Sequence, residues 1–305
     1  MSNVSVIIVS YNTCALLRQC LQTLLALGEA NEIIVVDNAS SDGSAALVQC
    51  EFPTVKLIAL PENRGLTVAS NLAAAAAQGK YLLYLGADAY PSAGVICGLA
   101  AYLDAHHQVG IATAELRLRD GSIDMDAHRG FPTPWASFTH FSGLNKLLPR
   151  SRWLNQYFLG YADLTQPHEI DLCISHFMFM RKALLEQIGP WDEDFFLYGE
   201  DVDFCYRTKA AGYTIMYLPQ FQVTHYKGAS VGIRKQTQDI AQASSATKLR
   251  VTQLSTTAMI LFYQKHLAKH YPWLLNSLVL AAIWLLGAIR LWRVKQRSGQ
   301  WSVNQ

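Results

Sequence analysis

The chain has 305 residues, of which 51% are hydrophobic and 16% are charged. This length and composition allow one large α/β domain with an appendage, or two domains, and they exclude disorder over the whole chain. The net charge of +2 hides an asymmetry. Residues up to Tyr226 include 14 Lys/Arg and 22 Asp/Glu, whereas those from Lys227 onward include 11 Lys/Arg and a single acid, Asp239. A basic tail with long aliphatic runs favours an anionic lipid surface as partner and argues against nucleic acid.

The six cysteines form no C-x-x-C pair and no zinc-binding spacing, so we expect buried thiols in a reducing cytosol. The apolar run at 4–9 is too short for a signal peptide and lacks a basic lead-in.

Short β-branched runs alternate with segments of helical apolar spacing in the first part of the chain. We predict strands at 4–10, 32–37, 55–60 and 81–85, and helices at 15–27, 44–50 and 66–78. Strands and helices that alternate over short connections are typical of an open, doubly wound parallel sheet. Because such sheets bind ligands beyond the carboxyl ends of their strands, Asp37 and Asp88 are expected near one crevice.

The rest of the chain is less regular. We interpret 110–176 as the wall of an acceptor site, and we expect an acidic loop that runs into a helix at 190–212 and a strand at 214–218. The predicted domains are a catalytic domain at 1–232 and a basic, hydrophobic helical tail at 233–305.

The tail contains an uncharged stretch from Leu274 to Ile289 inside a predicted apolar segment at 273–292, after a helix at 246–269. Its 16 residues, at about 1.5 Å each, fall short of the roughly 30 Å of a bilayer core. Tryptophans at 273, 284 and 292 suit the membrane interface. We expect monotopic or hairpin attachment to the cytoplasmic leaflet of the inner or plasma membrane; the alternative is an amphipathic core helix.

Three acidic positions carry candidate chemistry. Asp37 ends a strand before a turn of small polar residues, where it can accept hydrogen bonds from a base or ribose, while Asp42 in that turn suits an Asx turn or helix cap. Asp88 follows a strand and is placed to bind a cation that neutralises a diphosphate, although an aspartate before a proline turn is also common for structural reasons.

The third position is the segment Gly189-Pro-Trp-Asp-Glu-Asp-Phe-Phe-Leu-Tyr-Gly-Glu-Asp-Val-Asp203. Acids crowded among aromatic residues are costly unless a metal, a cation or a proton uses them. A helix N-terminus at Asp201 is the structural alternative. Downstream, His225 is isolated at a strand end, where a structural role is usual but a metal role is open if it meets an aspartate.

These motifs together resemble the family-2 glycosyltransferases, in particular the rhamnosyltransferase-like branch that builds bacterial surface polysaccharides. The resemblance covers about the first 230 residues. The matching residues are Val6-Ile-Ile-Val-Ser-Tyr-Asn12, Val35-Val-Asp-Asn-Ala-Ser-Ser-Asp-Gly43, Glu62-Asn-Arg-Gly65, Asn71, Tyr81 to Asp88, Phe195 to Cys205, Ala211-Gly-Tyr213 and His225.

The resemblance implies a GT-A fold, an α/β arrangement with a mixed sheet flanked by helices, here with a C-terminal helical tail. It implies that Asp37 contacts the nucleotide base, that Asp88 ends a D-x-D-like metal motif, that Asp201 in Glu200-Asp201 is the general base, and that His225 is a further metal ligand. The predicted sites are: catalytic, Asp201 and Glu200; donor-binding, Ser10, Asn12, Asp37, Asn63, Gly65, Asn71 and Asp88; metal, Asp88 and His225; acceptor-binding, Trp191, Asp192 and His176.

Two departures from the family pattern concern the metal. Gly86 stands where relatives have Asn or Asp, so a side chain that assists there is missing, and Ser175-His176-Phe177 replaces a common Gly-Ala/Gly pair.

The activity implied is inverting transfer of a sugar from a nucleotide-diphosphate donor, dTDP-rhamnose first and UDP sugars second, to a hydroxyl of a lipid-linked or growing surface polysaccharide. Mg²⁺ or Mn²⁺ is the expected cofactor. The alternatives are a catalytically lapsed nucleotide-sugar or glycan-binding protein and a nucleotidyltransferase, whose basic glycine-rich loop is absent. A dinucleotide oxidoreductase is disfavoured because no G-x-G-x-x-G follows the first strand.

Overall fold

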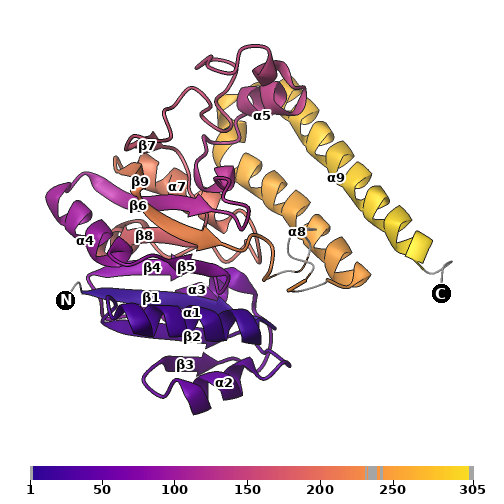
Figure 1. Ribbon diagram of the computed structural model, residues 1–305. Coiled ribbons are helices and arrows are strands. Elements are labelled where there is room, and N and C mark those ends of the chain that lie inside the picture. Colours follow the sequence, from indigo (N-terminus) through magenta and orange to yellow (C-terminus); the bar gives the residue numbers. More distant parts are fainter. Residues whose placement is uncertain (1–2, 231, 233–238, 241–242, 302–305) are drawn as a thin grey trace.

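A computed structural model describes residues 3–230, 232, 239–240 and 243–301, with side chains as far as Gln296. The strands are β1 (Val4–Ser10), β2 (Glu32–Asp37), β3 (Lys56–Ala59), β4 (Tyr81–Leu85), β5 (Ala89–Pro91), β6 (Val109–Arg117), β7 (His168–Ile170), β8 (Phe177–Arg181) and β9 (Thr214–His225). The helices are α1 (Cys14–Leu27), α2 (Ser44–Glu51), α3 (Gly65–Ala76), α4 (Val95–Ala105), α5 (Pro134–Phe141), α6 (Lys182–Ile188), α7 (Glu200–Ala210), α8 (Ser245–Phe262) and α9 (Trp273–Trp301). Figure 1 shows their arrangement.

The strands form one mixed sheet in the order β3-β2-β1-β4-β8-β6-β9-β5, and β7 also pairs with β9. β3, β2, β1 and β4 are parallel, as the alternation of strands and helices predicts. The prediction of a parallel sheet is wrong beyond β4, because β8 lies antiparallel to both β4 and β6. The mixed sheet flanked by helices that the family resemblance implies is confirmed.

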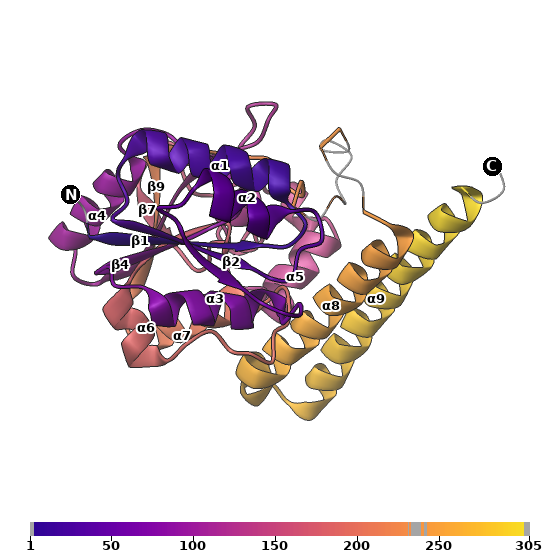
Figure 2. The same ribbon diagram turned by 90° about the horizontal axis from the view of Figure 1, so that it is seen from below.

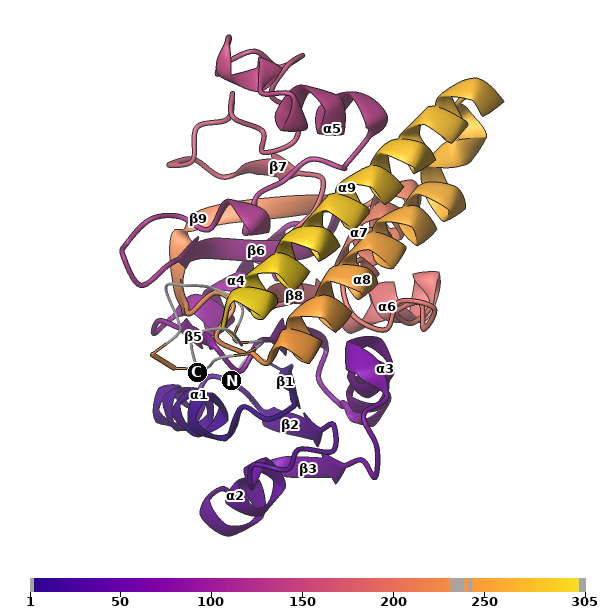
Figure 3. The same cartoon turned by 90° about the vertical axis from the view of Figure 1, so that its right-hand side faces the viewer.

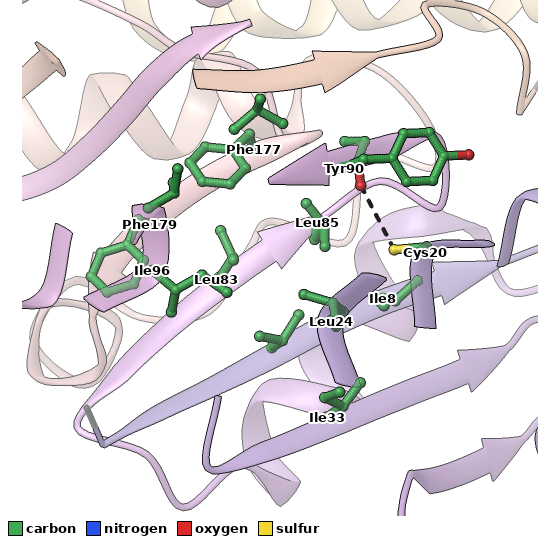
Figure 4. Close-up of a cluster of buried hydrophobic side chains, with 14 of the residues drawn as sticks. Ile8, Cys20, Leu24, Ile33, Leu83, Leu85, Tyr90, Ile96, Phe177 and Phe179 are labelled. Carbon is green, nitrogen blue, oxygen red and sulfur yellow. Dashed lines mark hydrogen bonds between the residues drawn. The ribbon is translucent and has the colours of Figure 1, made fainter. Parts of the chain in front are cut away.

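Two hydrophobic clusters lie on opposite faces of the sheet because side chains alternate along each strand. On β1, Ile8 joins the cluster beneath α1, α2 and α4, whereas Ile7 joins the cluster beneath α3, α6 and α7. Figure 2 shows α1 and α2 on one side of the strands and α3, α6 and α7 on the other. In the first cluster, β1, β2, β4 and β8 contribute Ile8, Ile33, Leu83 and Phe179, and the Cys20 thiol donates to the Ala89 carbonyl oxygen (Figure 4).

Beyond β4 the strands differ from the prediction: β5, β7 and β8 were not predicted, and β6 and β9 show why the pattern failed. β6 occupies part of the segment expected to be irregular; most of its residues are buried, so it shows no alternation of polar and apolar side chains. β9 continues past the predicted end at 218 to His225. The strand is continuous, but its register against β6 shifts between Leu218 and Gln222, the stretch that contains Pro219. This irregularity hid the second half of the strand from the pattern.

None of the six cysteines forms a disulfide, and only some are buried. Cys20, Cys173 and Cys205 lie in the core, whereas Cys50 and Cys97 are exposed. The expectation of buried thiols is therefore wrong for these two.

After β9 the chain forms a hairpin of α8 and α9, which lie side by side in Figures 2 and 3. Asn276 fixes the turn: its amide nitrogen donates to the carbonyl oxygens of Ala268 and Tyr271. Gly287 permits close packing, because a Cβ there would lie 2.5 Å from Thr256 Cγ2. α9 is long and apolar enough to cross a membrane, and only 6% of its apolar window is buried, which disfavours the alternative of a core helix.

Gly65 illustrates how tightly the start of α3 meets the loop before α7. Its φ is +85°, and a Cβ would lie 2.6 Å from the Phe196 carbonyl oxygen. Gly94 has nearly the same φ, +83°, and open space around it. Gly65→Ala is expected to destabilise the chain more than Gly94→Ala, which should cost only about 1–2 kcal/mol of backbone strain. Thermal or chemical unfolding of both variants measures the difference, and equal losses would contradict the close contact.

Candidate functional site

The carboxyl ends of β1 and β2 place Asp37 and Asn38 together, both nearly fully buried. Asp37 Oδ2 accepts from the Ser40 amide at 3.1 Å, while Asp37 Oδ1 is buried without a partner among the described residues. Asn38 reaches the next motif: its amide donates to Asn63 Oδ1 and to the Gly65 carbonyl, each at 3.1 Å. The carboxylate of Asp37 is therefore held in place with one free acceptor atom, as recognition of a base or ribose requires.

The segment after β1 closes against the turn after β2. Asn12 has a φ of 54°. Its side-chain Oδ1 accepts from the backbone amide of Ser41 at 2.8 Å, and its backbone amide donates to Ser40 Oγ. Asp42 accepts the amides of Cys14 and Ser44, so it holds helix starts, as its turn-and-cap interpretation expected. The hydroxyl of Ser10 bonds to that of Thr13 at 2.9 Å.

Beyond β4, Asp88 meets two histidines. Its Oδ1 lies 3.8 Å from His225 Nε2 and 4.0 Å from His176 Nε2. One candidate ligand atom from each residue falls within 4.8 Å of the others. Asp88 Oδ1 and His225 Nε2 are buried without hydrogen-bond partners among the described residues, although Asp88 Oδ2 accepts from the backbone and hydroxyl of Ser230. Unpartnered buried acceptors are costly, and one oxygen and two imidazole nitrogens around one point fit a divalent transition metal.

The glycine at 86 has a direct explanation in this cluster. A Cβ on Gly86 would lie 2.8 Å from Asp88 Oδ1 and 2.8 Å from His176 Cδ2. The His176 ring therefore fills the space that a side chain at 86 needs. The side chain that the family pattern places at 86 is missing, but an imidazole nitrogen from another strand end stands beside Asp88 in its place.

A second carboxylate orients His225. His225 Nδ1 lies 2.8 Å from Asp124 Oδ2, and Lys227 bonds to the other oxygen of Asp124. Burial alone would raise the pKa of Asp124, but the hydrogen bond from His225 and the charge of Lys227 hold that pKa well below its usual range. A permanently charged acceptor at Nδ1 keeps the proton there and leaves Nε2 free for a ligand.

The acidic pair Glu200 and Asp201, at the start of α7, is linked to the Asp88 cluster through Ser175. Ser175, the neighbour of His176, donates its amide to Asp201 Oδ2 at 3.4 Å and its hydroxyl to Glu200 Oε1 at 3.3 Å. The backbone before α7 turns through two left-handed residues, Tyr198 (φ 69°) and Gly199 (φ 85°), which aims both carboxyls. Adjacent residues, Ser175 and His176, thus join the acid pair to the Asp88 cluster.

The two carboxyls differ in exposure and protonation. Glu200 is 2% exposed, whereas Asp201 is partly open to solvent. Burial raises the pKa of Glu200 to about 8, with help from the charge of Asp201. Burial also raises the pKa of Asp201, against the opposing charge of Arg129. At neutral pH, Glu200 is therefore a neutral acid, and Asp201 is the carboxyl of the two that solvent can reach.

Three of the other acids of this region, Asp192, Asp194 and Asp203, have basic side chains as partners, most of them from the C-terminal hairpin. Lys265, which follows α8, pairs with Asp192 and, at 2.6 Å, with Asp194. Asp203 pairs with Arg207 at 2.8 Å and with His266 at 2.6 Å. Glu193 has no ion pair among the described side chains and instead accepts from Asn71 Nδ2 at 3.1 Å. Glu200 and Asp201 also form no ion pair with a described side chain, and they differ from Glu193 in that Ser175 binds both.

The remaining predicted residues lie in the loop beside this pair. Trp191 is buried, with its ring 4.4 Å from that of Tyr84, and Asn71 holds it through both amide atoms. Asp192 faces Lys265. Binding of the acceptor by Trp191 and Asp192, and of the donor by Asn71, stays a prediction.

Several residues of the site could not be found from the sequence. Asp124, Lys227 and Ser230 support the cluster from irregular segments, and Arg129 acts on Asp201 only through space. His176 is expected at the acceptor, yet it lies beside Asp88. One feature of the sequence could have indicated that His176 lies beside Asp88: positions 86 and 176 both depart from the family pattern.

Comparison with known proteins identifies the family. The family model described as "Glycosyl transferase family 2" matches residues 5–189, and that of "Glycosyl transferase family group 2" matches residues 172–295. The N-acetylglucosaminyl-diphospho-decaprenol L-rhamnosyltransferase of Mycobacterium tuberculosis is 26% identical over 241 residues, which cover 74% of this chain and 77% of that protein. Rhamnosyltransferase WbbL of Escherichia coli K12 is 29% identical over 98 residues, which cover 30% of this chain and 37% of that protein.

Solved structures show the same fold. GalNAc-T7 with UDP, GalNAc and Mn²⁺ has a TM-score of 0.56 at 17% identity; the match covers 86% of this chain and half of that one. The mannosyltransferase PcManGT from Pyrobaculum calidifontis with GDP-Man and Mn²⁺ has a TM-score of 0.55 at 19% identity, over 96% of this chain and 73% of that one. The chain therefore has the GT-A fold of these structures.

The chain belongs to glycosyl transferase family 2 and is a glycosyltransferase.

The protonation of Glu200 predicts a pH dependence of stability. A carboxyl with a raised pKa in the folded chain stabilises the fold below its ordinary pKa, and this contribution is lost as the pH rises through about 8. The free energy of unfolding should therefore fall between pH 5 and pH 9, and Glu200→Gln should reduce that fall. Chemical unfolding at several pH values measures it. The exposed Glu186→Gln is the control, and an unchanged slope in Glu200→Gln would contradict the assignment.

Proposed function

We propose that this glycosyltransferase moves a sugar, L-rhamnose as first choice, from a nucleotide-diphosphate donor to a hydroxyl of a lipid-linked acceptor, with inversion at the anomeric carbon. The curated relatives that support this choice are named as rhamnosyltransferases, one of them for a diphospho-decaprenol substrate. The observation that carries the proposal is the junction at Ser175-His176, which sets a candidate cation site beside a carboxyl that has no ionic partner among the described side chains.

At the donor end, Asp37 offers its free oxygen to the base or ribose of the nucleotide. Asn63 and Gly65 shape the neighbouring wall through Asn38, while Ser10 and Asn12 hold the turn that faces it. The diphosphate is assigned to the Asp88 end of the crevice, since the carboxyl ends of β1, β2 and β4 lie at one edge of the sheet.

Asp88, His225 and His176 would hold Mn²⁺ or Mg²⁺, and the mixed nitrogen and oxygen ligands favour Mn²⁺. Such an ion neutralises the charge that develops on a departing nucleoside diphosphate. The residues of the chain keep the ligands ready: Asp124 fixes the tautomer of His225, and Ser230 holds the second oxygen of Asp88.

Asp201 is the proposed general base, which takes the proton from the acceptor hydroxyl as that oxygen attacks the anomeric carbon. Its oxygens are fixed by the amides of Val202 and Ser175. Glu200, neutral at pH 7, adds no second negative charge beside it and supports the position of Ser175. A direct displacement of this kind inverts the configuration of the anomeric carbon.

The acceptor is assigned to the membrane. The exposed outer side of α9 carries Trp273, Leu278, Trp284, Leu285 and Trp292. We infer attachment of the tail, 233–305, to the cytoplasmic leaflet, beside a catalytic domain at 1–232. Apolar groups of this kind next to basic residues suit an anionic lipid surface, where lipid-linked acceptors reside.

Asp201→Asn is expected to lower sugar transfer by about 10²–10⁴-fold, because a positioned base contributes that much. Transfer of labelled sugar from a panel of nucleotide sugars to lipid-linked acceptor measures the loss. Donor binding should survive: a ligand at 100 times its dissociation constant adds about 2.7 kcal/mol of stability, which a thermal-shift assay detects. Asp120→Asn, a change of an exposed acid, is the control, and substantial transfer by Asp201→Asn would eliminate Asp201 as the base.

The metal site predicts a graded loss of Mn²⁺ binding. Asp88→Ala should abolish it, and His225→Ala or His176→Ala should weaken it by about tenfold or more. Electron paramagnetic resonance of free Mn²⁺, with and without nucleoside diphosphate, measures binding apart from activity. The exposed His107→Ala should bind as the wild type does, whereas wild-type affinity in His176→Ala would remove that residue from the site.

A further inference from the structure

We propose that residues 135–153, here called the aromatic segment, form a second membrane-contacting surface, which binds an anionic bilayer beside α9. This inference rests on the proposed attachment of the C-terminal tail, and it adds a contact contributed by the catalytic domain itself.

The first observation is where exposed apolar side chains gather. Among the described residues, the large hydrophobic side chains that are exposed lie in only two places besides Tyr11 and Leu25. One is α9. The other is the aromatic segment, with Phe138, Phe141, Leu147 (71% exposed), Leu148 and Trp153 (64% exposed). Exposed apolar side chains that gather on one surface mark an interaction site, whereas single ones scattered over a protein are normal.

The segment is built to keep these side chains outside. Thr133 caps α5 by accepting the Ala136 amide, and Pro134 starts the helix. The indole of Trp135 donates to the Trp153 carbonyl oxygen at 2.9 Å, and the two rings lie 4.4 Å apart. Asn155 then closes the segment by donating to the Pro149 carbonyl oxygen. Its shape is therefore held by its own hydrogen bonds, and its apolar side chains do not need the core.

The charge of the segment identifies the partner. No acid occurs between Asp126 and Asp163 in the sequence. Lys146, Arg150 and Arg152 are all exposed, and none of them forms an ion pair with a described side chain. Aromatic rings with unpaired basic residues suit the interface of an anionic bilayer, where rings enter the headgroup layer and cations meet phosphate.

The segment also continues the surface of the hairpin. Phe131, just before it, packs in the cluster of Phe195, Phe262 and Tyr263, to which Val279 and Ile283 of α9 belong. Its ring lies 5.3 Å from that of Tyr206, whose ring in turn lies 5.9 Å from that of Phe262. α5 and the first turns of α9 lie at the same end of the molecule in both Figure 1 and Figure 3. One bilayer can therefore meet both surfaces.

Hydrogen–deuterium exchange of the full chain in lipid nanodiscs tests the proposal, because it reports each segment separately. Backbone amides of 135–153 should exchange more slowly in nanodiscs containing phosphatidylglycerol than in nanodiscs of phosphatidylcholine alone. Lys146→Gln, Arg150→Gln and Arg152→Gln together should remove that difference, at about fivefold in affinity for each charge. A matched triple variant, Arg18→Gln, Lys56→Gln and Lys80→Gln, changes the net charge equally and should keep it.

The outcomes separate the two proposals. Protection of α9 with no lipid-dependent change at 135–153 would overturn the second surface and leave the tail attachment intact. Protection of 135–153 that persists in the first triple variant would overturn anionic lipid as its partner. Failure of the chain to bind nanodiscs at all would overturn both proposals. The expected result is that protection of 135–153 is lost in the Lys146, Arg150 and Arg152 variant and kept in the Arg18, Lys56 and Lys80 variant.

Discussion

The site depends on one antiparallel strand placed between parallel ones. β8 pairs with β4 so that Phe177 lies opposite Leu85, and the Gly86 amide donates to the His176 carbonyl oxygen. That register places Ser175 and His176 across from the residues that lead to Asp88. From this point Ser175 reaches α7 and His176 reaches Asp88. A slip of one residue would exchange these directions, because neighbouring side chains of a strand point to opposite faces.

Basic side chains of the hairpin contact some carboxyls of the acidic loop and leave others without an ionic partner. Lys265 pairs with Asp192 and Asp194, and the His266 ring bonds to Asp203. The same hairpin forms no ion pair with Glu200 or Asp201 through its described side chains, and burial raises the pKa of both. The tail thus stabilises the loop beside the acid pair without lowering the basicity of the pair. The charges that hold the loop in place contact the neighbouring acids, Asp192 and Asp194, and not the acid pair itself.

Much of the first half of the fold could be predicted from the sequence. The bounds of β1, β2 and β4 agree with the expected ones, because β-branched runs between turn residues leave little choice. The positions of Asp37, Asp88 and Asp201 followed from motifs at strand and helix ends. The sheet beyond β4 could not be predicted in the same way: β6 is buried along most of its length, and β9 contains Pro219 at a shift of register against β6. Contacts such as Asp124 with His225 join irregular segments far apart in the chain, and no local pattern encodes them.

The His176 ring fills the space beside Gly86 that a side chain at position 86 would need. A side chain at 86 and an imidazole at 176 exclude each other, because a Cβ at 86 would lie 2.8 Å from Cδ2 of the His176 ring. The two positions therefore act as one interchangeable unit: a carboxylate or amide can stand at 86 only when 176 is small, and an imidazole can stand at 176 only when 86 is glycine. Relatives with either pair would keep the same number of donor atoms beside Asp88, while they exchange oxygen for nitrogen. A paired substitution at 86 and 176 could thus change which ion the proposed site prefers and leave the backbone where it is.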